Sequence, residues 1–410
     1  MKITKYKLGE LVEVTRGASL SGQFYAEEGK LIRLTLGNFN MNGGGFKENT
    51  SKTDLYFTGT VRDEFILNEG DIITPLTEQS LGLLGTTARI PESGKYIQSQ
   101  DVALVRCKKG LLDPNFCYYL ISSSIVRQQL SAAAQQTKIR HTSPEKIKDC
   151  TVWVPDFDVQ KNIGRILTDI DNKIAINRRI NDNLEAMAKQ LYDYWFVQFD
   201  FPNEDGKPYK SSGGAMVWNE KLKREIPIGW TCCSIKEMCD INKKTINKDE
   251  HKQIEYLDTG SITQGHISNT EIYRVDMAPS RAQRKVEDLS ILYSSVRPRL
   301  LHYGILSTPK ENFIVSTGFV TLDAKCKNMA LMVYYFLTSN TITEHLASIA
   351  DTAVSSYPSI SPDDIANLDI VIPSNDIIQK YNDIVEPMFR KMSTLRKEIT
   401  RVRDKDCVKK

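Results

Sequence analysis

The sequence predicts a tandem α/β or α+β repeat, in which two similar domains are separated by a pair of long antiparallel coiled-coil helices. Three observations support this fold class: a match of the chain with itself, helical apolar spacing after each copy, and a turn-rich segment between the copies. With 410 residues, the chain is also too long for one ordinary core, so two or more domains are expected.

The self-match covers a whole domain. Residues 143–155, which begin with SPEKI and end with VWVP, correspond to residues 361–373, which begin with SPDDI and end with IVIP, at a spacing of 218 (361 − 143 = 218). Tyr118-Tyr119-Leu120 and Tyr335-Phe336-Leu337 also match, as do further upstream blocks in the same order. Solenoid repeats are only about 20 to 50 residues long, so we infer a duplicated domain. Two unrelated domains of similar composition are the alternative.

Each copy mixes strands and helices. Short strands and turns precede a helix, at residues 116–134 in the first copy and 330–350 in the second. A short strand that ends at Pro155 or Pro373 closes each copy. The regular alternation of a doubly wound sheet is missing, which is why the prediction is α/β or α+β.

A long helix is expected after the first copy. Its apolar residues recur in steps of three and four, broken only at Lys173 and Asn177, as in a coiled-coil seam. At 1.5 Å per residue, about 38 residues would extend roughly 57 Å, too long to bury inside one domain. Asn177 either lies buried in the seam and fixes the register or faces solvent; the sequence leaves both open. The seam residues are Ile163, Ile166, Ile170, Ile180, Leu184, Met187, Leu191 and Tyr194.

The second copy is followed by a similar helix, in which Pro387 should cause a kink or mark the start. The two helices would most simply pack antiparallel and hold the two domains at a fixed separation. The alternative is that each helix covers only its own domain. The apolar positions of this helix are Val385, Met388, Met392, Leu395, Ile399 and Val402.

Turn-forming residues at 201–214 mark a linker between the copies. The predicted boundaries are 1–155 for the first domain, 156–200 for the first helix, 201–228 for the linker, 229–373 for the second domain and 374–410 for the second helix. Aromatic residues gather just before the linker, and they would be buried either in the domain's own core or against a partner protein. They are Tyr192, Tyr194, Trp195, Phe196, Phe199 and Phe201.

Composition is that of a soluble globular protein, with 40% hydrophobic and 26% charged residues. No stretch approaches the roughly 18 apolar residues of a membrane span, so a cytoplasmic protein without membrane contact is expected. The eight cysteines form no C-x-x-C pair, which argues against a zinc site and for scattered reduced thiols. A net charge of +3 permits a nucleic-acid partner without requiring one.

Catalytic motifs are missing. The chain has no phosphate-binding P-loop, no G-x-G-x-x-G, no H-E-x-x-H and no G-x-S-x-G. We therefore expect no catalytic residues, no metal and no cofactor, and we favour a binding role. A fused methyltransferase or nuclease with unrecognised motifs is one alternative, and a coiled-coil scaffold that binds protein is another.

Binding to double-stranded DNA would need cations for phosphates and forked or amide side chains for base edges. Such residues occur in both copies, and aligned positions differ in chemistry while the apolar framework matches. Two readers of different sequences on one scaffold would have this pattern, although ordinary solvated surface residues are the alternative for each position. The candidates are Gln79, Ser80, Gln98, Gln100, Lys138, Arg140 and His141 in the first copy, and Arg281, Arg284, Lys285, Arg297, Arg299, His302, Ser355, Ser356 and Tyr357 in the second.

Over nearly its whole length the chain resembles the specificity subunits of type I restriction-modification systems. The most specific pieces are the helix at 163–196, the segment LYDYWFVQFDF at 191–201, and the run GKPYKSSGG at 206–214 that leads to IPIGW at 226–230. The resemblance implies that each repeat is a target-recognition domain and that the helices form the spacer. It also implies a split, asymmetric DNA site and a subunit without catalysis of its own.

The resemblance further implies docking of two methyltransferase subunits, which carry S-adenosylmethionine, and of ATP-driven restriction subunits. The chain departs from the family pattern at its end, where Pro387 and the charged tail 403–410 put the symmetry of the two docking sites in doubt. Base-reading residues cannot be carried over, because recognition loops differ most between members. The docking candidates are Ile170, Ile174, Leu184, Leu191, Tyr194, Trp195, Phe196, Met392 and Leu395.

Overall fold

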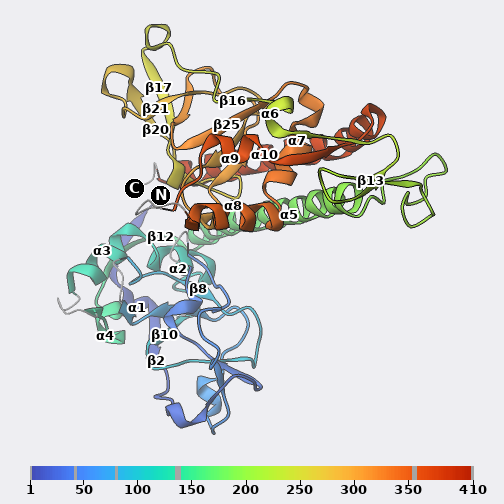
Figure 1. Cartoon of the computed structure of the whole chain (residues 1–410). Helices are drawn as coiled ribbons and strands as arrows, with labels where there is room; N and C mark the ends of the chain where they lie inside the picture. Colours follow the sequence, from blue (N-terminus) through green and yellow to red (C-terminus); the bar gives the residue numbers. More distant parts are fainter. Residues whose placement is uncertain (1, 41–43, 79–81, 134–139, 353–357, 408–410) are drawn as a thin grey trace. The chain divides into compact units, whose positions relative to one another are not determined.

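The computed structural model describes residues 2–40, 44–78, 82–133, 140–352 and 358–407; the side chains of Lys248 and of 403–407 are not described. Within it the chain forms two compact units (Figure 1). Unit 1 comprises residues 1–175 with 406–410, and unit 2 comprises residues 176–405.

Unit 1 is built on a four-stranded sheet in the order β2-β10-β6-β8, beside a second four-stranded sheet, β3-β5-β4-β9. Two further pairs, β1 with β12 and β7 with β11, are antiparallel. The strands are β1 (Ile3–Lys7), β2 (Val12–Arg16), β3 (Tyr25–Ala26), β4 (Leu31–Arg33), β5 (Tyr56–Phe57), β6 (Ile72–Pro75), β7 (Thr77–Glu78), β8 (Ala88–Arg89), β9 (Tyr96–Ile97), β10 (Val102–Cys107), β11 (Arg140–His141) and β12 (Thr151–Pro155). The helices are α1 (Leu8–Leu11), α2 (Pro114–Ile121), α3 (Ser124–Ala133), α4 (Pro144–Lys148) and the start of α5 (Phe157–Tyr192).

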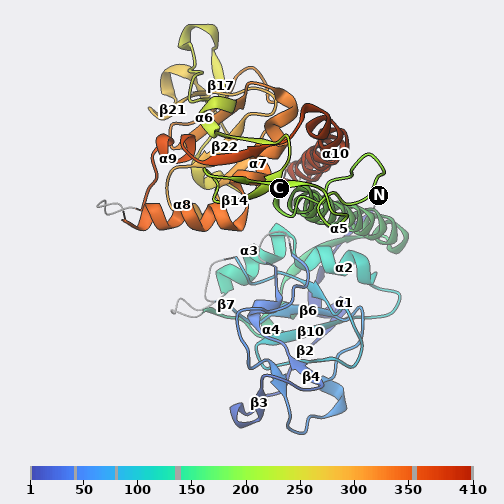
Figure 2. The same ribbon diagram turned by 45° about the vertical axis from the view of Figure 1, so that its right-hand side comes forward.

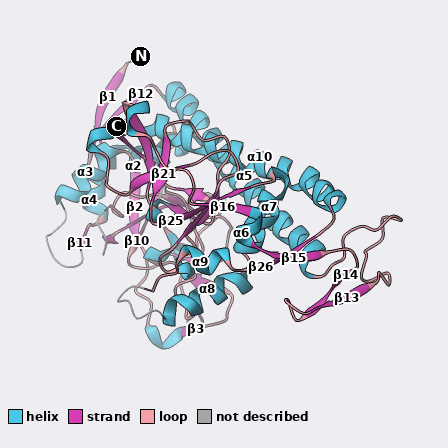
Figure 3. Ribbon diagram, turned by 45° about the horizontal axis from the view of Figure 1, so that its top comes forward, coloured by secondary structure: helices cyan, strands magenta, loops and turns pink. Residues whose placement is uncertain are grey.

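Unit 2 repeats this plan with the sheets β16-β25-β22-β23 and β20-β17-β24-β21 and the pair β15-β26. An additional hairpin of β13 and β14 lies at one edge of the unit (Figure 3). The strands are β13 (Met216–Asn219), β14 (Arg224–Pro227), β15 (Thr231–Ser234), β16 (Cys239–Ile241), β17 (Gln253–Leu257), β18 (Ile262–Thr263), β19 (His266–Ile267), β20 (Glu271–Arg274), β21 (Ala282–Lys285), β22 (Ile291–Ser294), β23 (Tyr303–Ile305), β24 (Phe313–Ser316), β25 (Phe319–Ala324) and β26 (Asp369–Ile372). The helices are α6 (Ile235–Met238), α7 (Ala330–Leu337), α8 (Asn340–Thr352), α9 (Pro362–Ala366) and α10 (Asn375–Cys407).

The predicted duplication is confirmed in the central sheets and in the segments that close each copy. The repeated SP segments become α4 and α9, where Ser143 and Ser361 each accept a hydrogen bond from the third helical residue and proline takes the first helical position. The strands that follow, β12 and β26, both pair with the first strand of their copy. One mixed α/β fold therefore occurs twice, because the same capping residues and apolar strands recur in the same order.

The cores of both units are apolar residues of the central sheets and the helices that cover them. In unit 1, Ile72 and Ala103 belong to a cluster with α2, α3 and α4, while Ile73 and Leu104 point to a second cluster on the opposite face. This alternation follows from the two-residue period of strands. In unit 2 the largest cluster unites the central sheet with α7, α10 and the end of α5.

The long helices pack antiparallel within unit 2, as the sequence predicts (Figures 1 and 2). Near one end of the pair, Asn177 Nδ2 of α5 donates to Glu398 Oε2 of α10 at 3.3 Å. Further along, Glu185 and Arg396 form an ion pair of 3.0 Å, and at the other end the Phe196 ring lies 4.8 Å from that of Tyr381. Asn177 is only 7% exposed, so it occupies the buried position of the two that the sequence leaves open.

The predicted seam faces the core of unit 2 only in part, because Leu184 and Leu191 pack against that core while other seam residues lie outward. Ile180 and Met187 are 36% and 51% exposed, whereas Asn181 and Ala188, one residue further along, are buried. Small and amide side chains at the contact bring α5 close to its neighbours and turn the larger apolar residues outward. The helix then ends in a π-helical turn, Asp193–Val197, which shifts the register of the last aromatic residues.

Two other expectations about the helices are settled. Helix α10 begins at Asn375 and continues through Pro387, so the proline does not mark its start. Among the aromatic residues before the linker, Tyr192, Trp195, Phe196, Phe199 and Phe201 are buried in the core of unit 2, while Tyr194 stays exposed. The domain's own core, rather than a partner, buries this cluster.

Candidate nucleic-acid interface

In each copy, three segments that are distant in sequence meet at one backbone residue. In unit 1 the N–H of Leu76 donates to Asp101 O at 2.8 Å, and Leu76 O accepts from the N–H of Thr142 at 2.8 Å. In unit 2 the N–H of Ser295 donates to Gly318 O at 2.9 Å, and Ser295 O accepts from Ile360 at 2.8 Å. We call this arrangement the junction; it comprises residues 76–78, 99–101 and 140–142 in unit 1 and 295–297, 316–318 and 358–360 in unit 2.

The next residue along the chain repeats the match. Thr77 pairs with His141 in unit 1, and Val296 pairs with Ser359 in unit 2. At the next position the residue types differ between the copies. Glu78 pairs with Arg140 in the first copy, whereas in the second copy the N–H of Arg297 donates to Pro358 O. The backbone is shared, and the side chains it presents are not.

The unit 1 junction collects Gln100, Arg140 and His141 of the predicted DNA-binding residues. Gln100 and His141 are exposed, and the Gln100 carbonyl accepts from Arg16 Nε at 2.9 Å. Arg140 is engaged by Glu78 Oε1, which lies 3.0 Å from its Nη1. The predicted residues Gln79, Ser80 and Lys138 lie outside the described part of the chain.

The unit 2 junction collects more basic residues. Arg297 is exposed and has a left-handed backbone with φ +48°, just before the short turn Pro298–Leu300. On the other side of the 316–318 turn, the Arg281 carbonyl accepts from the N–H of Thr317 at 2.9 Å. Arg299 pairs with two carboxylates of α8, Glu344 at 3.1 Å and Asp351 at 2.7 Å. Of the other predicted residues, Ser355, Ser356 and Tyr357 lie outside the described residues.

His302 is fixed near this junction by its ring, with Nδ1 2.7 Å from Ile262 O and 3.2 Å from Thr263 Oγ1. Its main-chain carbonyl accepts from Ser294, the last residue of β22. The residue as a whole is half-buried. A histidine held in this way presents a donor or an acceptor in a defined direction.

Three predicted residues do not join the junctions. Gln98 is buried, and its Nε2 donates to Thr15 O at 2.9 Å and Val102 O at 3.0 Å, so the amide closes the turn below Gln100 and has no surface to offer a base. Arg284 Nη1 donates to Asn242 O at 3.0 Å, and Lys285 lies 3.8 Å from Glu250. The Arg284 contact lies just after β16, and the Lys285 contact lies at the turn Lys248–Glu250 before β17.

The predicted docking residues fall into three groups. Trp195, Phe196, Met392 and Leu395 are buried inside the chain and have no surface for a partner. Tyr194 is exposed, and the remaining candidates, Ile170, Ile174, Leu184 and Leu191, are half-buried. Sequence reasoning missed the most exposed apolar residue of this region, Ile176 at 55%. With Ile180, Met187 and Tyr194 it forms the exposed α5 stripe; its helical spacing was visible in the sequence, but its outward direction was not.

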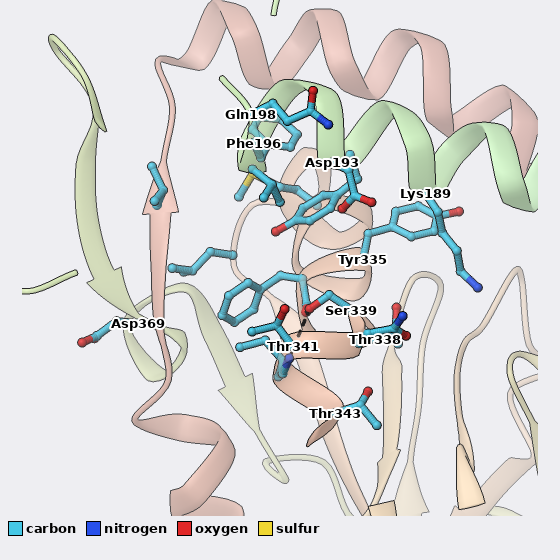
Figure 4. A pocket seen from close by; sticks show the side chains of 18 of the residues that line it. Lys189, Asp193, Phe196, Gln198, Tyr335, Thr338, Ser339, Thr341, Thr343 and Asp369 are labelled. Carbon is cyan, nitrogen blue, oxygen red and sulfur yellow. Dashed lines mark hydrogen bonds between the residues drawn. The ribbon is translucent and has the colours of Figure 1, made fainter. Parts of the chain in front are cut away.

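A cavity of about 580 Å³ opens in unit 2 between the end of α5 and the start of α8. Figure 4 shows Lys189, Asp193 and Phe196 on one side, Tyr335 in the middle, and the hydroxyls of Thr338, Ser339 and Thr341 on the other. Burial raises the pKa of the Asp193 carboxyl. The aromatic residues of the lining are Tyr192, Phe196, Tyr303, Tyr335 and Phe336, and among the described residues of the wall no nucleophile is hydrogen-bonded to a base.

Among the described residues, no group of three or more histidine, cysteine or acidic side chains is placed to hold a metal ion. Likewise, no helix in this part of the chain has the length and apolar character needed to cross a membrane.

The arrangement is therefore that of a duplicated binding domain with a helical pair. The family model of the type I restriction modification DNA specificity domain matches residues 2–186 and 227–402. The chain belongs to this family and contains two copies of its domain.

Individual relatives agree with this assignment. The chain is 23% identical over 302 residues to the type I restriction enzyme MjaIX specificity subunit of Methanocaldococcus jannaschii, a match that covers 71% of this chain and 66% of that relative. It is 28% identical over 144 residues to the HindI specificity subunit of Haemophilus influenzae, with 35% of this chain and 31% of the relative covered. The crystal structure of a type I system S subunit from M. genitalium has the same fold, with a TM-score of 0.62 at 16% identity, covering 98% of this chain and 93% of that one.

Proposed function

We propose that this chain is the non-catalytic specificity subunit of a type I restriction-modification complex and reads a split, asymmetric DNA site. Residues 1–155 would read one half and residues 229–373 the other. The observation that carries the proposal is the junction, which repeats the same backbone hydrogen bonds while presenting unlike side chains. Sequence is read by side chains at base edges, so equal backbones with different side chains suit two different half-sites.

The chemistry of the two junctions supports different readings. Unit 1 offers the Gln100 amide and the His141 ring, groups that pair with base edges in the major groove. Unit 2 offers Arg281 and Arg297, and forked guanidinium groups suit guanine edges or phosphates. Arg299 is partly neutralised by its two carboxylate partners, so we assign it a smaller part in phosphate binding.

The helices 156–200 and 374–410 would serve as a spacer between the half-sites. Helix α5 has 36 residues, about 54 Å at the usual rise per residue. Two modest readers held at a fixed separation bind as one bivalent unit, because the second contact is made at high effective concentration. The specificity of the whole chain is then close to the product of the specificities of the two domains.

Partner subunits would dock on the helical region. The exposed α5 stripe is an apolar surface among exposed polar residues of the helix such as Arg179 and Asn183, and exposed apolar patches commonly mark protein interfaces. We propose that it receives methyltransferase subunits, two per complex, and that restriction subunits join this assembly. The cofactor S-adenosylmethionine would then belong to the methyltransferase, with none on this chain, and the complex would act on chromosomal DNA in the cytoplasm.

A domain exchange tests the function. Residues 1–155 are replaced by those of another family member, and methylated sites are mapped across the genome in cells with the parent chain, the chimaera or neither. We expect one half of the recognition sequence to change and the other half with its gap to stay. A change in both halves, or methylation that does not depend on this chain, would refute the assignment.

A further inference from the structure

The carboxylate of Glu78 is buried at the unit 1 junction, with only 2% of its side chain exposed. Its Oε2 accepts hydrogen bonds from three successive backbone N–H groups, those of Gly82 at 3.1 Å, Leu83 at 2.9 Å and Leu84 at 3.1 Å. Its Oε1 lies 3.0 Å from Arg140 Nη1. A buried charge is tolerated only when it is paired and hydrogen-bonded. The Glu78 carboxylate has both an arginine partner and three backbone hydrogen bonds.

Arg140 continues the same network. Its Nη2 donates to the carbonyl of Ser131 and, at 3.1 Å, to Ser131 Oγ near the end of α3. From the same helix, Arg127 Nη2 donates to the carbonyl of Gly82. Glu78 and Gly82 border residues 79–81, and Ser131 and Arg140 lie on either side of residues 134–139. The ion pair between the buried Glu78 and the half-buried Arg140 therefore holds the described chain on both sides of two segments that carry predicted DNA-binding residues.

Among the described residues, the second copy has no Glu–Arg pair at this place. Arg297 stands where Glu78 stands, and Pro358 stands where Arg140 stands. Its turn is tied to α8 by Arg299 instead, whose side chain is 53% exposed and whose carboxylate partners are at least half exposed. Surface ion pairs of this kind contribute little, so the described backbone at the junction is held by different side-chain contacts in the two copies.

We propose that Glu78, together with Arg140, is a positioning residue for the half-site read by residues 1–155. The inference rests on the proposed function. Glu78 does not touch DNA, since it is buried and a carboxylate would repel phosphate. It acts by holding the backbone N–H groups of 82–84 and the guanidinium of Arg140 in one arrangement, so that neighbouring side chains meet the base edges at fixed angles.

The test uses the full chain assembled with its methyltransferase partner. Affinities are measured for the cognate duplex, for a duplex altered in the first half-site and for one altered in the second. In Glu78→Gln the side chain keeps its size and loses its charge. We expect its discrimination at the first half-site to fall by about tenfold, within the range for misreading one base pair, while discrimination at the second stays within twofold.

Two controls separate positioning from general damage. Glu92→Gln removes a carboxylate from an exposed pair with Lys95, 2.8 Å apart, and should leave both half-sites unchanged. Ile147→Ala opens the core of unit 1 and should lower the melting temperature without changing the discrimination ratio. If Glu78→Gln does not fold, Arg140→Lys keeps the charge and loses the forked contact to Ser131, and the same selective loss is expected.

Three results would overturn the proposal: unchanged discrimination in Glu78→Gln, an equal loss at both half-sites, or the same loss in Ile147→Ala. Failure of the proposed function looks different. In that case the parent chain itself would not distinguish the altered first half-site from the cognate duplex, and the positioning role would fall with it.

Discussion

Arg390 of α10 forms a bidentate ion pair with Asp288. Nη1 lies 2.6 Å from Oδ1 and Nη2 lies 2.6 Å from Oδ2, and the N–H of Thr308 donates to Oδ1 at 2.8 Å. The two side chains are 31% and 30% exposed, so water screens the pair only in part. We predict that Asp288→Asn lowers the free energy of unfolding of unit 2 by about 2 kcal/mol, between the values for surface and buried pairs.

The loss should depend on pH. The Arg390 guanidinium holds the pKa of the Asp288 carboxyl below its ordinary value of 3.8. A carboxyl whose pKa is lower in the folded state stabilises the fold fully above its unfolded pKa, and this contribution disappears as the pH falls through the folded pKa. The difference between Asp288→Asn and the parent should therefore be complete at pH 7 and should shrink below about pH 4.

Urea unfolding followed by tryptophan fluorescence provides the assay. Three of the four tryptophans, Trp195, Trp218 and Trp230, lie in unit 2, so a Trp153→Phe background makes the signal specific to that unit. A double-mutant cycle with Arg390→Gln should give a coupling energy of about 1.5 kcal/mol at pH 7.

The matched control is Asp276→Asn, which breaks a surface pair with Arg274 whose side chains are 61% and 71% exposed. It should cost less than about 0.5 kcal/mol. A coupling energy for Asp288 and Arg390 below about 0.3 kcal/mol, or an equal loss at pH 7 and pH 3, would refute the argument.

Three other predictions concern thiols, docking and spacing. In a Cys407→Ser background, thiol titration of the folded chain should label the exposed Cys326 first. Burial raises the pKa of the Cys239 thiol to about 12, so this thiol should react only after unfolding. Prompt labelling of Cys239 would contradict this prediction. Met187→Glu should reduce co-purification of the methyltransferase at least severalfold. Because the Met187 side chain is half exposed, the free energy of unfolding should change by less than about 0.5 kcal/mol. Unchanged co-purification would remove this residue from the docking surface. Inserting one heptad into both α5 and α10 should lengthen the gap between half-sites in methylation maps while both half-sites persist, and an unaltered gap would argue against a helical ruler.

The duplication was predictable because it depends on local signals. Ser143 and Ser361, with the prolines that follow them, mark helix starts wherever they occur, and the apolar strands after them are five and four residues long. The rotation of α5 was not predictable from spacing. Steps of three and four define a stripe but not the direction it faces, and close packing at Ala188 and Asn181 turned Met187 outward.

The candidate interface was predicted only in part, for a similar reason. An amide in a turn can close the turn or read a base, and the sequence does not distinguish Gln98, which does the first, from Gln100, which is exposed. The role of Glu78 was missed because its partners are backbone groups and an arginine 62 residues later (140 − 78 = 62). Such long-range pairs become visible only when the strands are placed.

The junction is held by main-chain atoms at Leu76 and Ser295, two residues with nothing in common as side chains. Anchoring of this kind places few demands on composition, so the bordering loops are free to accumulate substitutions while the scaffold is inherited unchanged. New preferences could thus arise by mutation or by exchange of whole segments, each step leaving a foldable protein. A library that varies only exposed loop residues around one junction should accordingly yield many soluble members, and its diversity would measure how evolvable this architecture is.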